Sequence, residues 1–531
     1  MPDPATDNND KLGIWERRST RRGLLGIGAA GVAGGASTVI LGLARDGVDG
    51  DGSAGGGESG PGDSTTEPPD EEPTVVPPAG QIEEPERRAA HLLRRAGFGG
   101  TRKEVAEFAE LGREEAADRL LDFDSFDASL LEDHLLARDY NTYRLGDAYR
   151  RWLTRMVYSP RQLEERMTFI WHGFLTSQLS QIGGPFSRRI KLMDAQIDLY
   201  RTMALPVYDE LLKAVSKDPA MMIFLNSVDS SAGQPNENYP RELMELFSMG
   251  EGNYSEEDVR EAARAFTGWR FTGPGRRPSN PDDRDEQEEL MRGWQPEFFV
   301  ASRLHDEDEK TFLGATGNWD GIDIIDLIMA DDAPVRFITT RLFHEFVHDH
   351  PSASALDELS GLWHDSGHDV RAVVRAILVS DEFYSEEAYR AKVRSPIELL
   401  VGAVRGLELE WDFRGAERFS ESMGQLLYNP PNVAGWPGGP AWISSGTFLA
   451  RVNFIDLLFF QSKFGIKPGI LSDNSSAQEA VDLAVVALLD GNISDSSREL
   501  MVEHVSSARN AIERGRAAAY LALSSPEFQT T

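Results

Sequence analysis

Several carboxylates and an arginine share one side of a predicted helix at residues 239–249. Glu242 and Glu245 are three residues apart, and Glu237 and Arg241 lie just before them. Helical bundles use carboxylates at this spacing, with a histidine from a neighbouring helix, to hold a divalent metal. The spacing therefore predicts Glu242 and Glu245 as metal ligands, and all four residues as parts of a catalytic polar pocket.

Histidines elsewhere in the chain supply the other groups that such a pocket needs. His172 lies in a predicted helix at 160–177, with Glu165 seven residues earlier on the same face. We expect His172 as a metal ligand and Glu165 as a further catalytic carboxylate. His305 and Asp306 stand in a predicted tight turn, where they suit proton transfer.

The same charged residues have a structural interpretation. Arg241 with Glu245, and Glu165 with a neighbouring arginine, are spaced to form ion pairs that neutralise each other inside a helical bundle. Charged side chains with shifted pKa values occur at functional sites, but structural ion-pair networks shift pKa values as well. Both interpretations stay open at the level of sequence.

A rigid segment rich in proline and glycine, NPPNVAGWPGGPAWISS, begins at Asn429. It presents Trp436 and Trp442 near Asn432, an arrangement that suits stacking against a sugar ring. These three residues are the predicted substrate-binding group. The alternative is that the tryptophans hold the loop against the core, which is the commoner role of large aromatic side chains.

The sequence His344-Glu345-Phe346-Val347-His348 matches the H-E-x-x-H pattern of zinc peptidases. On a helix, it would place His344 and His348 on one face as zinc ligands. The apolar residues of the predicted helix at 332–348 leave Arg341, His344, Glu345 and His348 on the opposite, solvated face. The position of a third histidine is taken by Ser354, which argues against a zinc peptidase.

The composition restricts the kinds of partner. The 531-residue chain has 87 Asp and Glu against 54 Lys and Arg, which gives a net charge of −33. Such a chain repels phosphate, and no basic stripe is present, so nucleic acid is excluded as a partner. The scarcity of lysine favours an acidic, halophilic surface, because salt screens its self-repulsion. The absence of cysteine excludes disulfides and thiolate metal sites.

The N-terminus predicts export. Residues 19–25, STRRGLL, precede a Gly/Ala-rich apolar run that ends at Leu43. This is typical of a twin-arginine signal, so residues 1–44 are a predicted leader that is either cleaved or kept as a tether, and we expect membrane contact through this leader only. Residues 45–84 are an acidic Gly/Ser/Pro linker that we expect to be disordered. The protein is then extracellular or tethered at the cell envelope.

Residues 85–531 predict a single large helical domain, because period-two alternation is almost absent. The fold class is mainly α, a multi-helix bundle with one small β-hairpin insertion near 296–314, in which 298–303 pairs with 310–313. A disordered loop is expected at about 276–292. A C-terminal extension of two or three helices is expected from about 472. The other predicted helices span residues 85–96, 101–111, 142–158, 160–177, 187–203, 205–216, 239–249, 255–268, 320–330, 332–348, 368–379, 395–406, 414–427 and 445–464.

Six stretches, taken together in this order, resemble the family called domain of unknown function 1800. They are HLLRRAGFGG from His91, EERMTFIWHGF from Glu164, the segment from Pro235 to Trp269, the segment from His305 to Ile328, VRSPIELLVGAVRGL from Val393, and the segment from Asn429 to Phe454. The resemblance implies an exported, mostly helical protein of unsettled activity. It also implies a possible partner, because members are often encoded beside exported proteins that resemble sulfatases.

These observations lead to three functional hypotheses. The first is an exported hydrolase that uses a divalent metal to cleave an envelope or extracellular polymer. The second is a non-catalytic envelope scaffold, or a partner of a sulfatase-like protein. The third, which the sequence disfavours, is a zinc metallopeptidase through His344 and His348.

Overall fold

The computed structural model describes residues 80–275, 283–460, 466–467 and 469–531. The predicted leader and nearly all of the predicted linker lie outside these ranges, as does part of the predicted loop at 276–292. Ordered contacts begin slightly before the predicted domain boundary at residue 85. Gln81 forms a bridge with Ser385, and Ile82 is buried.

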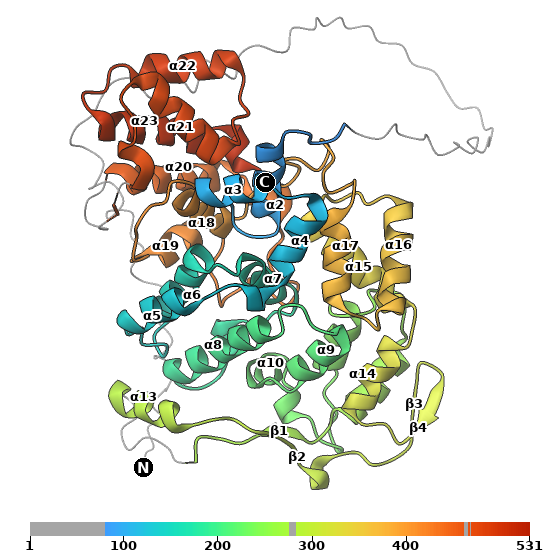
Figure 1. Cartoon of the computed structure of the whole chain (residues 1–531). Helices are drawn as coiled ribbons and strands as arrows, with labels where there is room; N and C mark the ends of the chain where they lie inside the picture. The colour runs from blue at the N-terminus through green and yellow to red at the C-terminus, as the bar shows by residue number, and fades with distance from the viewer. Residues whose placement is uncertain (1–79, 276–282, 461–465, 468) are drawn as a thin grey trace, which may run out of the picture. The chain divides into compact units, whose positions relative to one another are not determined.

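The described chain is mainly α-helical, as predicted (Figure 1). Its first helices are α2 (Pro85–Arg95), α3 (Arg102–Ala109), α4 (Arg113–Leu121), α5 (Ser129–Ala137), α6 (Leu145–Tyr158), α7 (Gln162–Phe174), α8 (Phe186–Thr202), α9 (Tyr208–Ser216), α10 (Pro219–Phe224), α11 (Asn238–Glu245) and α12 (Glu256–Ala265). The later helices are α13 (Arg284–Gly293), α14 (Gly321–Met329), α15 (Ala333–Phe346), α16 (Ala353–Asp365), α17 (Val370–Val379), α18 (Pro396–Gly406), α19 (Ala416–Ser422), α20 (Ser445–Phe460), α21 (Ala477–Leu489), α22 (Asp495–Val505) and α23 (Ala511–Ser524).

The predicted hairpin between 298–303 and 310–313 is wrong. The structure has two separate antiparallel pairs instead, in which β1 (Trp269–Phe271) pairs with β2 (Phe298–Val300) and β3 (Lys310–Phe312) pairs with β4 (Ala315–Gly317). Strand β2 finds its partner before α13 in the chain, a long-range pairing that local turn patterns do not reveal. The tight turn of β3 and β4 instead uses Leu313 and Gly314, both at positive φ.

Part of the predicted disordered loop is a helix. Within 276–292, the structure describes residues from 283 onward, and α13 forms there. Asp283 begins this helix, because its side chain accepts hydrogen bonds from the backbone N–H groups of Asp285 and Glu286. Leu290 and Met291 are buried on the side that packs against α8. The density of charges on its other side concealed this short apolar face.

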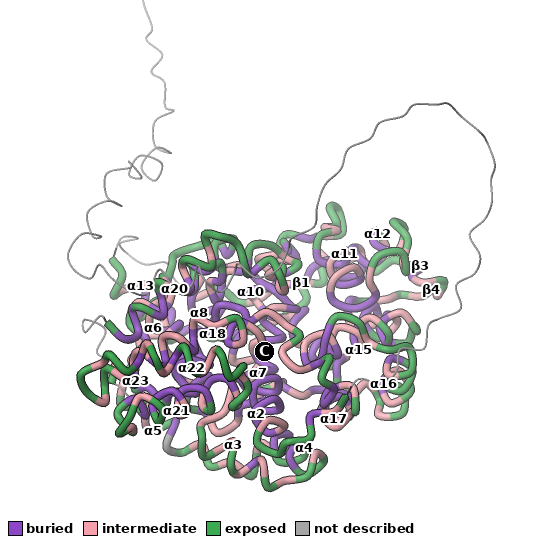
Figure 2. Tube along the Cα trace, turned by 90° about the horizontal axis from the view of Figure 1, so that it is seen from above, coloured by how far each residue is buried: buried purple, intermediate pink, exposed green. Residues whose placement is uncertain are grey.

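Helix α7 lies in the interior of the domain. Most of its 13 residues are buried, and it packs against α4, α6 and α8. Figure 2 shows the buried interior around α7 and the exposed segments around the rim. A helix that is buried on nearly all sides must satisfy its polar side chains internally, so the charged residues of α7 require partners from neighbouring helices.

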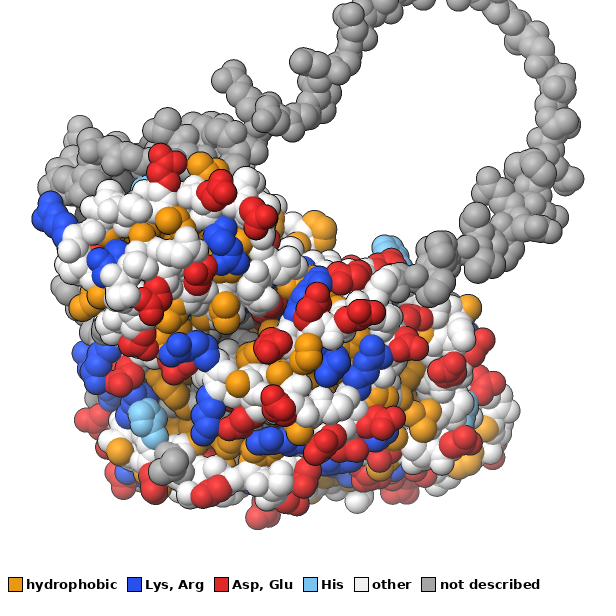
Figure 3. Space-filling view, turned by 45° about the horizontal axis from the view of Figure 1, so that its top comes forward, with side chains coloured by type: hydrophobic (Ala, Val, Ile, Leu, Met, Phe, Trp, Pro, Cys, Tyr) orange, Lys and Arg blue, Asp and Glu red, His pale blue; other side chains and the backbone are white. Residues whose placement is uncertain are grey.

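The C-terminal segment beyond residue 472 forms α21, α22 and α23, in agreement with the expected two or three helices. Helices α21 and α23 pack closely, and α23 also contacts α20. Among the described residues, none of the helices combines the length and the apolar character needed to cross a bilayer. Figure 3 shows carboxylates spread over one face of the domain, with arginines and lysines between them.

Gly515 in α23 provides a test of this helix packing. A Cβ at this position would lie 1.9 Å from the Leu471 carbonyl oxygen, so Gly515→Ala should lower the free energy of unfolding by about 1–3 kcal/mol. Gly361 in α16 has open space around it, so Gly361→Ala should instead stabilise by about 1 kcal/mol through helix propensity. Urea unfolding of both variants measures whether each substitution lowers or raises the free energy of unfolding. Equal effects would contradict the close contact at Gly515.

Candidate functional site

An open cleft of about 1260 Å³ lies beside α15. Its walls come from α15 and from three segments, residues 249–253, 391–393 and 436–440. A smaller cavity of about 140 Å³ shares Arg341, Glu345, Lys392 and Trp436 with it and reaches further in, toward α7. We call the two together the α15 cleft.

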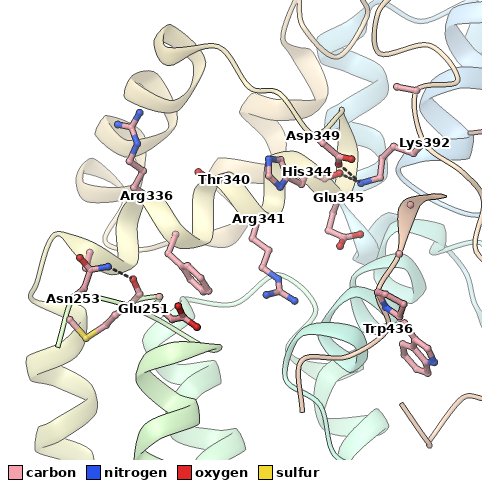
Figure 4. Close-up of a pocket in the computed structure, with 18 of the residues that line it drawn as sticks. Glu251, Asn253, Arg336, Thr340, Arg341, His344, Glu345, Asp349, Lys392 and Trp436 are labelled. Carbon is pink, nitrogen blue, oxygen red and sulfur yellow. Dashed lines mark hydrogen bonds and ion pairs between the residues drawn. The ribbon is translucent and has the colours of Figure 1, made fainter. Parts of the chain in front are cut away.

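Helix α15 turns one side to the core and another to the cleft. Leu342, Phe343 and Phe346 are buried in the core, whereas Arg341, His344 and Glu345 line the cleft. Figure 4 shows Arg341 and Glu345 extending from α15 toward the side on which Trp436 lies. The spacing of three and four residues places these polar groups on one helix face.

Arg341 is a largely buried cation that has no ion-pair partner among the described residues. Its guanidinium lies 4.1 Å from the centre of the Phe174 ring. Within the described residues, it has neither a hydrogen bond nor an ion pair. Burial lowers the pKa of Arg341, and the nearby Glu345 carboxylate opposes that shift. An unpaired, desolvated guanidinium that lines a cleft is a strong potential ligand for an anion.

Glu345 and Lys392 stand beside it. The half-buried Glu345 carboxylate forms no hydrogen bond or ion pair with any described residue. Lys392 donates a hydrogen bond to the carbonyl oxygen of His344, and its Nζ lies 3.6 Å from Asp349. Burial lowers the pKa of Lys392 and of His344. The cleft is thus lined by three cations, by five carboxylates and by a histidine that favours its neutral form; these are Arg336, Arg341 and Lys392, then Glu251, Asp331, Asp332, Glu345 and Asp349, and His344.

The opposite wall is the predicted aromatic loop. Trp436 lines both cavities and packs edge to face on His172, with ring centroids 5.3 Å apart. Gly435 permits this position, because its φ is +83° and a Cβ there would lie 2.3 Å from the Gly173 carbonyl oxygen. Trp436 thus lines the cleft, whereas Trp442 is buried and borders only the smaller cavity.

Asn432 has a local role instead. Its side-chain oxygen accepts a hydrogen bond from the Ala434 backbone N–H at 2.9 Å, which stabilises the turn. Asn432 is exposed and does not line the α15 cleft. The predicted substrate-binding group is therefore divided, since the tryptophans border the cleft and the asparagine shapes the loop that carries Trp436.

His172 is buried in an aromatic surrounding. Its Nε2 accepts a hydrogen bond from the Tyr428 backbone N–H at 3.0 Å, and the rings of Trp152, Tyr428 and Trp436 surround it. Burial lowers the pKa of His172 to about 3, so the imidazole is neutral at ordinary pH. The hydrogen bond from Tyr428 occupies Nε2, and through it His172 holds the loop in place. His172 does not face the predicted carboxylates.

Glu165 is fully buried and bonded to Arg201. Arg201 Nε lies 2.7 Å from the Glu165 carboxylate, and Arg201 also pairs with Asp198. The structural interpretation of Glu165 as an ion-pair partner is therefore the one found. In this position, the carboxylate neutralises a buried guanidinium and is not directed into the α15 cleft.

The carboxylates of α11 have similar local partners. Arg241 pairs with Glu237 at 3.2 Å and with Glu256 at 2.7 Å, not with Glu245 as the spacing suggested. Glu245 accepts a hydrogen bond from Tyr254. Glu242 has no such partner in the part of the chain that the structure describes, and burial raises its pKa, with Glu245 adding to the shift.

His305 and Asp306 are also engaged. His305 Nδ1 lies 2.8 Å from the Thr267 carbonyl oxygen. The Asp306 carboxylate accepts two hydrogen bonds from Arg264, which holds the pKa of Asp306 below its usual range in spite of burial. These contacts tie the segment before β3 to α12.

The predicted metal-binding cluster does not form. Across residues 80–275, 283–460, 466–467 and 469–531, no three His, Asp or Glu side chains converge in a way that would hold a metal. His172, Glu242 and Glu245 are therefore not brought together. His172 is instead enclosed by the rings of Trp152, Tyr428 and Trp436, and Glu245 accepts its hydrogen bond from Tyr254.

The H-E-x-x-H residues do not share a helix face. Helix α15 ends at Phe346, two residues before His348. His344 lines the cleft, but His348 is buried against the Phe343 ring and accepts a hydrogen bond from the His350 backbone N–H. The expectation that His348 lies on a solvated face with Arg341 and Glu345 is wrong, because the chain leaves the helix before reaching it.

Sequence reasoning overlooked Arg341, Glu345 and Lys392 as members of one functional site. The first two were visible as a polar helix face beside His344, which was the available signal. Lys392 carried no local signal, since it reaches the cleft from the segment before α18.

The fold and this cleft define a mainly helical protein with one open, polar and partly aromatic cleft. The chain belongs to the family described as "Protein of unknown function (DUF1800)", which matches residues 91–530. Neither a curated protein nor a solved structure matches the chain.

His172 should control part of the acid stability. Its pKa is about 3 in the folded protein and near 6.5 when unfolded, so the unfolded chain binds a proton that the folded one excludes as pH falls through this interval. The free energy of unfolding should therefore fall by up to about 1.4 kcal/mol per pH unit more steeply in the parent than in His172→Gln. Urea unfolding between pH 7 and pH 4.5 measures this, with the exposed His350→Gln as control. Parallel pH profiles would refute it.

His344→Ala and His348→Ala should differ. Loss of the buried His348 contacts should lower the free energy of unfolding by about 1–3 kcal/mol, whereas loss of the half-buried His344 side chain should change it by less than about 0.5 kcal/mol. Urea unfolding with and without added zinc tests both. A zinc-dependent stabilisation that either substitution abolishes would instead support a shared zinc site.

Proposed function

We propose that the α15 cleft binds an acidic saccharide segment of an envelope or extracellular polymer. The observation that carries this proposal is Arg341, a largely buried guanidinium without an ion-pair partner among the described residues, in a cleft that also contains Lys392. Burying an unpaired cation is costly, and an anionic ligand removes that cost.

The overall charge makes this local feature informative. With a net charge of −33, the chain as a whole repels anions, so long-range attraction does not bring an acidic ligand to it. Recognition must then come from short contacts in a desolvated place, where a guanidinium binds carboxylate or sulfate in a bidentate manner. The cleft provides such a place at Arg341.

The saccharide component of the proposal rests on Trp436 and on size. An indole ring offers an apolar surface for a sugar ring, and Trp436 lies on the wall opposite Arg341 (Figure 4). A cavity of about 1260 Å³ exceeds the usual range for a single small ligand, roughly 300–1,000 Å³. The volume and openness suit a segment of a longer chain.

Hydrolysis of that polymer is the second candidate. It is supported by Glu345 and His344, which line the same cleft as a free carboxylate and a histidine whose pKa is lowered by burial. A carboxyl group and an imidazole are side chains that hydrolases use to move protons. Metal assistance remains a separate prediction, since the donors predicted for a divalent metal do not converge.

The scaffold hypothesis draws its support from the ion pairs. Glu165, Glu237 and Asp306 are all paired with arginines, as expected for structural residues. A sulfatase-like partner stays a prediction. The direction of Trp436 favours ligand binding over docking, because its ring lines the cleft and packs on His172. Export by the twin-arginine route and location at the cell envelope likewise remain proposals, based on residues 19–25.

Arg341→Met tests the function in the full chain. The substitution keeps a side chain over Phe174 but removes the charge, so affinity for an acidic oligosaccharide such as oligogalacturonate should fall about 10- to 100-fold. Calorimetric titration measures it. The matched control is Arg336→Met, because Arg336 lines the same cleft, pairs with Asp357 and is 60% exposed.

Two further measurements separate binding from hydrolysis. Glu345→Gln should tighten binding of the acidic oligosaccharide, because it removes a like charge, and should abolish any cleavage detected as new reducing ends. A neutral oligosaccharide of equal length should bind weakly to all variants. Equal affinity for the neutral and acidic ligands, or an unchanged affinity in Arg341→Met, would refute the proposal.

A further inference from the structure

A second cavity, of about 330 Å³, lies on another side of the domain. Its walls come from α2, α3, α18 and α21, together with the short helix η8 (Pro526–Gln529). It shares no lining residue with the α15 cleft. We call it the glycine-lined pocket, because Gly99, Gly100, Gly402, Gly406 and Gly491 form part of its wall.

Arg394 is the principal polar group of this pocket. The residue is only 5% exposed, and its guanidinium lies 4.0 Å from the centre of the Phe528 ring. Its Nε donates a hydrogen bond to the Thr530 carbonyl oxygen at 3.0 Å. Its two terminal nitrogens have no acceptor among the described residues, and no carboxylate lies within ion-pair distance. A nearly buried guanidinium therefore presents two unsatisfied NH₂ groups.

Among the described residues, the neighbouring charged groups leave Arg394 without a carboxylate of its own. Arg94 and Asp490 also line the pocket and pair with each other at 2.6 Å. Asp490 additionally accepts a hydrogen bond from Tyr389 and lies 3.7 Å from Arg390. One carboxylate thus serves two arginines and a phenol, and Nε and one terminal nitrogen of Arg94 remain buried without a partner. Burial, reinforced by Arg94, lowers the pKa of Arg394 to about 9.

The positive charge at this place exceeds the negative charge. Arg94, Arg390 and Arg394 gather around Asp490, so the interior cluster carries more guanidinium than carboxylate. At the mouth, Glu86 is exposed, and Arg102 pairs with Asp473 and Glu408. Uncompensated buried charge is strongly unfavourable, and a bound anion compensates it.

The rest of the pocket is apolar. Val105, Val486, Leu488 and Phe528 contribute to its walls, and Val486 is 58% exposed at the edge of α21. Gly402 makes room for the cation, because a Cβ there would lie 2.7 Å from a terminal nitrogen of Arg394. A pocket that combines an apolar stretch of wall with an oriented, unpaired guanidinium selects ligands that have both an apolar body and an anionic head.

We propose that the glycine-lined pocket binds a small organic monoanion, with its carboxylate on Arg394 and its apolar body against Val105, Val486 and Leu488. The planar guanidinium offers two parallel N–H donors that match a carboxylate. This site is independent of the saccharide proposed for the α15 cleft, since the two cavities have different walls and different arginines.

The test is calorimetric titration of the full chain with hexanoate. Hexanol supplies the same body without the charge, and inorganic phosphate supplies charge without the body. Hexanoate should bind saturably at a stoichiometry of one, and Arg394→Gln should weaken it about tenfold or more. Arg102→Gln is the control, because Arg102 lies at the mouth, is 42% exposed and already has carboxylate partners.

Gly402→Ala provides a second variant that keeps all charges. Its methyl group should displace the Arg394 guanidinium and weaken hexanoate binding, while circular dichroism confirms that both variants are folded. Binding of hexanol or phosphate as tight as that of hexanoate would overturn the proposal. So would absence of saturable hexanoate binding in the parent chain, or an unchanged affinity in folded Arg394→Gln or Gly402→Ala.

Discussion

The C-terminal turn of α7 holds both walls of the α15 cleft. On one side, His172 Nε2 accepts the Tyr428 backbone N–H, and Gly173 meets Gly435 so closely that a Cβ would not fit. On the other side, the Phe174 ring lies beneath the Arg341 guanidinium of α15. Three consecutive residues of one buried helix thus fix the aromatic loop and the cationic helix face relative to each other.

This arrangement explains why His172 must stay neutral. A protonated imidazole would lose its acceptor nitrogen, and therefore the hydrogen bond from Tyr428. The neighbouring aromatic rings exclude water and lower the pKa of His172 to about 3, which removes this risk over the ordinary pH range. His172, which the sequence suggested as a metal ligand, instead holds the loop that carries Trp436 in position.

Local patterns predicted most helices, because the apolar period of 3.6 residues lies within a single segment, as do the N-caps that the structure shows at Ser255 and Ser395. They failed for β2, whose partner β1 lies on the other side of α13 in the chain. The site was predictable only in pieces. Trp436 and the polar face of α15 were visible, but their juxtaposition depends on α7, and Lys392 enters from a distant segment.

The buried arginines differ in whether they form an ion pair. Some buried arginines pair with a carboxylate, as Arg201 does with Glu165. The chain has 87 acidic residues, so carboxylates are not in short supply, and yet neither Arg341 nor Arg394 has a described carboxylate within ion-pair distance. Both guanidiniums instead rest on a phenylalanine ring beside an open cavity. In so acidic a protein, a cation that is kept unpaired at a cavity wall retains its capacity to bind an external anion.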